Sequence, residues 1–194
     1  MKRLQTIVVL MCGITPGLWG QQGGLPYAEI PETPEAYTGG AVAARMVDGL
    51  GFRYYWATEG LRPEDLEFRP SAEARSTGET VDHIMGLSRV ILNAALQQAN
   101  TPQEPLERSF EEKRALTLNM LKQAADIYRN SEDLSANTVI FENDGNRSEF
   151  PFWNLVNGPI ADALWHTGQV VTHRRTSGNP FPAGVSVFTG KKRD

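Results

Sequence analysis

The sequence feature that most constrains the fold is the recurrence of apolar residues at helical spacing in separate segments. Four such segments are found, at about 40–61, 76–100, 109–130 and 152–177. Two of them open on a Ser-x-x-Glu capping box, one at Ser76 with Glu79 and one at Ser109 with Glu112. Amphipathic helices joined by short to moderate loops are typical of a four-helix bundle. The sequence therefore predicts an all-α fold of this architecture.

The segment before the last helix has a different pattern. Thr138–Phe141 is rich in β-prone residues, Asn143–Asn146 is a turn signal, and Ser148–Phe150 can return as a second strand. We expect a small hairpin or an ordered loop here. Pro159 lies inside the last helical segment and predicts a kink, or a helix start near Asn157.

The N-terminus has the pattern of a secretory signal peptide at residues 1–20. Lys2 and Arg3 precede an uncharged and mostly apolar run, and Gly20 offers a small residue for cleavage. An uncleaved anchor and a lipoprotein cut at Cys12 are the alternatives, but the run is short for a membrane span and Met11 is large for a lipoprotein site. Residues 21–40 are too poor in apolar periodicity to pack, so they are predicted to wrap the surface or to be partly disordered. The domain is expected at residues 41–190.

Charge and cysteine usage narrow the class of protein. The 194 residues carry a formal net charge of -4, and removal of Lys2 and Arg3 with the signal makes the chain more acidic. No basic field remains to attract nucleic acid or an anionic membrane. Cys12, the one cysteine, lies in the predicted signal, so the mature chain has no disulfide and no thiolate ligand. We expect a periplasmic or secreted protein without stable membrane insertion, and dimerisation through a helix face stays open.

A candidate metal site joins the second and last helices. Asp162 and His166 are four residues apart and therefore stack on one helix face, where His83 can meet them. Two imidazoles and one carboxylate are a common ligand set for Zn²⁺, Ni²⁺, Fe²⁺ or Mn²⁺. Three protein ligands leave a position open for water or substrate, as in catalytic sites. The alternative is a surface ion pair or a capped core histidine.

Other polar residues lie near this candidate site. His173 is about 10 Å from His166 along the helix axis, too far for the same ion, so a supporting or surface role is expected. Glu79 is one turn before His83 and could be a fourth ligand or general base, although its capping box is the simpler role. Gln169 could orient a ligand or the substrate through its amide.

Two further groups of residues have competing interpretations. Arg174 and Arg175 could meet an anionic substrate, although acidic partners on other helices are the commoner explanation for such arginines. Trp56, Trp153 and Trp165 could line a binding surface, but tryptophans of an amphipathic helix are more often core residues.

Two stretches resemble a known family. The run from Asp162 to Gln169, followed by Arg174-Arg175 and Gly178-Asn179-Pro180, is similar to the last-helix motif of the DinB-like superfamily. Ser76–Ile84 resembles its first-histidine motif, and the likeness covers about Ala41 to Pro180.

This resemblance implies a four-helix bundle and a metal-dependent enzyme. The family's usual ligands are three histidines, one on the second helix and two on the last, spaced four residues apart. His83 and His166 match two of them, whereas Asp162 replaces the third, which changes the charge and softness of the set. Characterised relatives include thiol-dependent transferases and isomerases. An exported protein meets less of the cytosolic thiol pool, so a metal-dependent hydrolase is the competing expectation, the substrate being unknown. A non-catalytic ligand- or partner-binding protein is the alternative function.

Overall fold

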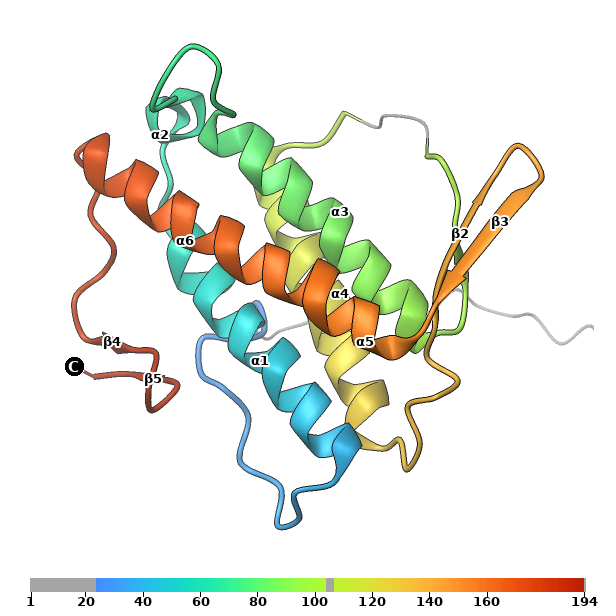
Figure 1. The fold of residues 1–194 in the computed structure, drawn as a ribbon. Coiled ribbons are helices and arrows are strands. Elements are labelled where there is room, and N and C mark those ends of the chain that lie inside the picture. The colour runs from blue at the N-terminus through green and yellow to red at the C-terminus, as the bar shows by residue number, and fades with distance from the viewer. Residues whose placement is uncertain (1–23, 104–106, 194) are drawn as a thin grey trace, which may run out of the picture.

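Four long helices form most of the fold in the computed structural model, which describes residues 24–103 and 107–193. They are α1 (Gly39–Thr58), α3 (Thr77–Ala95), α4 (Phe110–Arg129) and α6 (Ala161–Thr176). Helix α1 packs against α4 and α6, and α3 packs against the same two helices (Figure 1). The predicted signal peptide at residues 1–20 lies outside the described residues. None of the described helices is both long and apolar enough to cross a membrane.

Side-chain caps fix where the long helices begin. Ser76 and Glu79 form the predicted capping box, with each side chain bonded to the backbone N–H of the other residue at 3.1 and 2.8 Å. Ser109 and Glu112 repeat the arrangement at the start of α4. These caps satisfy backbone N–H groups that have no partner within the helix, so both predicted helix starts are confirmed.

The segment before α1 packs more closely than its sequence suggests. Tyr27 is buried among the core residues, and its ring lies over Gly51, where a Cβ atom would come within 2.4 Å of it. Its hydroxyl donates to Asp48, which is also paired with Arg129. The expectation that residues 21–40 do not pack is therefore wrong for Tyr27, because a single large aromatic needs no periodicity to fill a gap left by a glycine.

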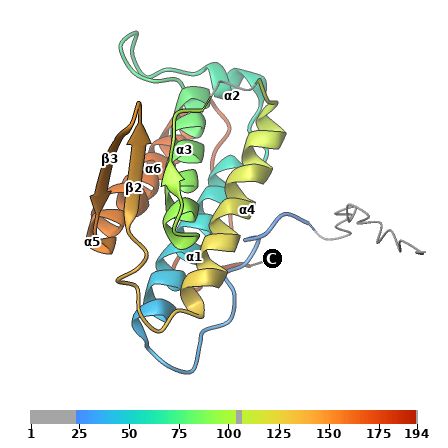
Figure 2. The same ribbon diagram turned by 90° about the vertical axis from the view of Figure 1, so that its right-hand side faces the viewer.

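The predicted hairpin is present. Strand β2 (Val139–Asn143) pairs antiparallel with β3 (Asn146–Phe150) through a turn at Asp144 and Gly145, both of which have positive φ. A short strand that the sequence did not predict, β1 (Ala99–Asn100), adds to β2 in parallel. The hairpin lies beside α3 and α5, which β2 contacts (Figure 2). The fold is therefore mostly helical rather than all-α, since a second small sheet joins β4 (Val185–Ser186) to β5 (Lys191–Lys192).

The last helix carries a wide turn at its proline. Helix α5 (Phe152–Leu155) continues into the π-helical turn η1 (Val156–Ile160) and then into α6. Pro159 has no N–H for the helical ladder, and the wider turn accommodates it without ending the helix.

The polar connection after α1 contains a short helix that the sequence did not predict, α2 (Pro63–Glu67).

Candidate metal centre

The three predicted ligands converge where α3 faces α6. Nε2 of His83 lies 3.1 Å from Oδ2 of Asp162, and Nε2 of His166 lies 3.3 Å from Oδ1 of the same carboxylate. One donor atom from each residue lies within 4.8 Å of the other two. Asp162 therefore stands between the two imidazoles and presents one oxygen to each.

The donor set has the composition of a divalent metal site. The His83 and His166 nitrogens lie 3.1 and 3.3 Å from different oxygens of Asp162, which are hydrogen-bond distances. One donor atom from each residue lies within 4.8 Å of the other two. The residues present thus fit a metal ion by number and chemical type, and they are close enough to converge on one ion.

The orientation of His166 favours coordination through Nε2. Its Nδ1 atom lies 2.7 Å from Oε1 of Gln169, one turn further along α6. In the tautomer with the proton on Nδ1, His166 donates to this oxygen and offers its Nε2 lone pair to an ion beside Asp162. Such a bond to the outer ring nitrogen is the usual support for a metal-binding histidine. Gln169 therefore has the orienting position that its spacing predicted.

The cluster is open to solvent on one side. The side chain of Asp162 is 39% exposed and that of His166 is 14% exposed. The rings of His83 and His166 meet edge to face with centroids 4.6 Å apart, which fixes both imidazoles relative to each other. A ligand from solvent can therefore reach this cluster without any rearrangement of the helices.

Glu79 and His173 are occupied elsewhere. Both carboxylate oxygens of Glu79 are bonded to Arg69, and one of them also accepts the Ser76 N–H of the capping box. His173 is 7% exposed, with Nδ1 at 3.2 Å from the Thr77 hydroxyl and its ring against Phe68. His173 is thus neither a surface residue nor part of the cluster. It packs α6 against the start of α3.

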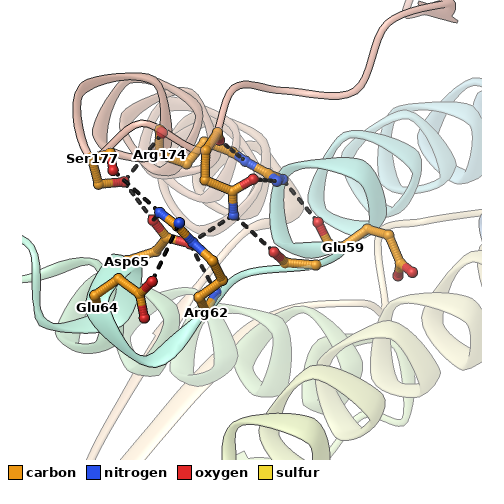
Figure 3. A network of polar contacts seen from close by, with 8 residues as sticks. Glu59, Arg62, Glu64, Asp65, Arg174 and Ser177 are labelled. Carbon is orange, nitrogen blue, oxygen red and sulfur yellow. Dashed lines mark hydrogen bonds and ion pairs between the residues drawn. The ribbon is translucent and has the colours of Figure 1, made fainter.

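Arg174 has a structural role rather than an anion-binding role. Its side chain is 2% exposed, and its guanidinium donates to the backbone carbonyls of Trp56, Ala57 and Glu59 at the end of α1. Figure 3 shows the contact with Glu59. The expectation of an acidic partner was wrong, because the carbonyls of a helix C-terminus offer the same acceptor chemistry without a charge.

The neighbouring carboxylate belongs to the same network. Asp65 is fully buried and accepts from Arg62, Ser177 and Asn179 (Figure 3). These bonds hold the pKa of Asp65 well below its usual range, the Arg62 guanidinium contributing most. The network joins α2 to the end of α6. Arg175 is exposed and forms none of the bonds of this network.

Of the tryptophans Trp56, Trp153 and Trp165, two are not core residues. Trp153 is 75% exposed and Trp165 is 73% exposed, whereas Trp56 is partly buried and donates to the Ala28 carbonyl. The core expectation is therefore wrong for Trp153 and Trp165. Apolar character predicts burial only where another element covers that helix face, and no described element covers these two side chains.

A groove that the sequence did not reveal lies next to the cluster. It has a volume of about 710 Å³ and lies between α6, the start of α3 and the loop before α3. Its lining includes His166, Gln169 and Trp165 from α6, and Arg75 from the loop. Nothing in the local sequence pattern of Arg75 indicates a site, because the loop reaches α6 only in the folded chain.

Comparison with known proteins identifies no relative: no protein-family model, curated protein or solved structure matches this chain.

Proposed function

We propose that this protein is an exported metal-dependent enzyme with the DinB-like four-helix-bundle architecture, and that His83, Asp162 and His166 hold its divalent ion. The observation that carries the proposal is the convergence of these three residues, one donor atom from each lying within 4.8 Å of the other two. The reaction is hydrolysis or thiol-dependent group transfer on a small molecule. Both reactions need an open coordination position, which three protein ligands leave.

The chain's own residues would have distinct tasks in such a reaction. Gln169 holds the His166 tautomer that offers Nε2 to the ion. Asp162 supplies negative charge between the two imidazoles, which offsets part of the ion's charge. When bound, the ion would polarise a substrate group or lower the pKa of a coordinated water or thiol. The groove beside His166 is the place for the substrate.

Metal analysis of the purified protein tests this proposal. About one equivalent of Zn²⁺, Ni²⁺, Fe²⁺ or Mn²⁺ is expected in the wild type, as for a single site with three protein ligands. Asp162→Asn and His166→Ala should each reduce the metal content to a small fraction of the wild-type value. Asp82→Asn is the matched control, because Asp82 is a partly exposed carboxylate on the adjacent position of α3 and pairs with Lys113 instead. Equal, sub-stoichiometric metal in wild type and His166→Ala would overturn the proposal.

A non-catalytic binding protein is the second candidate, favoured by the exposed aromatic rings. Trp153 and Trp165 are both largely exposed, and Phe141 and Phe150 of the hairpin are 43% and 41% exposed. Exposed aromatics of this kind are typical of binding surfaces. This function predicts a metal-free protein whose melting temperature is unchanged by chelator. A structural ion instead predicts a large loss of stability in chelator with no exchangeable ligand.

A further inference from the structure

The groove next to the cluster has the size and lining of a small-molecule site. Its volume of about 710 Å³ falls within the usual range for such sites, roughly 300–1,000 Å³. One wall is α6, which contributes Trp165, Gln169, Thr172 and His173. His166 belongs to both the groove and the metal cluster, so a molecule in the groove lies directly beside the candidate ion.

Arg75 brings an uncompensated positive charge to this groove. The nearby Arg69 forms a two-bond ion pair with Glu79, at 2.7 and 2.8 Å, and so uses both oxygens of that carboxylate. Arg75 is exposed, and within residues 24–103 and 107–193 no carboxylate forms an ion pair with it. Because Arg69 already occupies Glu79, the Arg75 guanidinium lines the groove without an ion-pair partner among the described residues.

Much of the remaining lining of the groove is apolar. Trp165 is 73% exposed and lines the groove, which gives a ligand an aromatic surface. Pro70 and Ala74 add apolar atoms from the loop. An apolar body against Trp165 and an anionic group at Arg75 are therefore the complementary features of a ligand.

We propose that the groove binds a small organic monocarboxylate, with its apolar body against Trp165 and its carboxylate on the Arg75 guanidinium. This inference rests on the proposed function, because it names the substrate class of the same site. A guanidinium matches the planar carboxylate in geometry, and the one arginine among the described residues that line the groove matches one negative charge. Because His166 also lines the groove, the bound ligand lies next to the candidate ion.

The test uses 4-phenylbutyrate as the probe and the uncharged 4-phenylbutyramide as its counterpart. Binding to the full chain, loaded with Zn²⁺, is followed by the NMR shift of the Trp165 indole N–H, identified with Trp165→Phe. We expect saturable binding of the acid, and binding of the amide about tenfold weaker or less. Arg75→Gln should lower the affinity for the acid to that for the amide. Arg175→Gln is the matched control, because Arg175 is an exposed arginine on α6 outside the groove, and should bind as the wild type does.

Several outcomes would overturn the inference. They are equal affinity for acid and amide, an equal effect of Arg75→Gln and Arg175→Gln, tighter binding of phenyl phosphate than of the acid, or no saturable shift at all. Zinc content is measured in the same samples. If zinc occupancy is full but the acid is not preferred, this inference is wrong and the metal site is unaffected. If no zinc is bound, the proposed function itself is wrong.

Discussion

Nδ1 of His166 lies 2.7 Å from Oε1 of Gln169, and Nε2 of the same ring faces Asp162. In the tautomer with the proton on Nδ1, the ring donates to the amide oxygen and offers the Nε2 lone pair to an ion in the cluster. Without this bond the neutral imidazole would populate both tautomers, and one of them cannot coordinate through Nε2.

Gln169 should therefore control metal affinity without touching the ion. Gln169→Ala is expected to weaken zinc binding by about 10–100-fold, as is typical when the support of a metal-binding histidine is removed. Gln169→Glu keeps an acceptor oxygen and should retain near wild-type affinity. Competition with a chromophoric chelator measures both values. Unchanged affinity in Gln169→Ala would show that Nδ1 needs no acceptor.

Arg174 should be among the most important residues for stability outside the apolar core. Its guanidinium satisfies three backbone carbonyls at the end of α1. Because each buried acceptor left unpaired costs about 1–3 kcal/mol, Arg174→Met should lower the free energy of unfolding by about 3 kcal/mol or more. Arg175→Met removes the adjacent exposed arginine and should change the free energy of unfolding by less than about 0.5 kcal/mol. Urea denaturation compares the two, and similar losses would contradict this role for Arg174.

His173 should make stability depend on pH below neutrality. Burial lowers the pKa of His173 below its usual value of 6.5, so the folded state binds this proton less readily than the unfolded chain does. The free energy of unfolding should therefore fall as the pH drops below about 6.5. His173→Gln should have a shallower slope between about pH 7 and pH 5.

Metal-free samples are needed for that comparison, so that the cluster does not contribute. Asp65 does not interfere in this window. Its pKa is lowered, and its contribution is present above the unfolded value of 3.8 and is lost only at more acidic pH. Parallel slopes for wild type and His173→Gln would exclude His173 as the source.

The sequence predicted the elements whose signals are local. The two capping boxes, the Asp144-Gly145 turn and the irregularity at Pro159 each depend on a few adjacent residues, and all are present. The convergence of His83 with Asp162 and His166 was also predictable, because the spacing of four residues fixed one face and left only the partner helix to find.

The features that the sequence did not predict depend on contacts between distant segments. Tyr27 is buried because Gly51 leaves room for its ring, and Arg174 is satisfied by the end of α1. Trp165 is exposed because no described element covers its face of α6. Arg75 reaches the groove only through the path of its loop. None of these contacts can be predicted from the periodicity of the local sequence.

Cobalt substitution tests the central claim most directly, because the visible spectrum of Co²⁺ reports both coordination geometry and access. We predict that about one equivalent of Co²⁺ saturates intense visible bands of a tetrahedral site, and that an added small thiol or anion shifts them. The bands should be lost in Asp162→Asn and retained in Asp82→Asn. Weak, unsaturable bands that are the same in both variants would contradict a metal centre built from His83, Asp162 and His166.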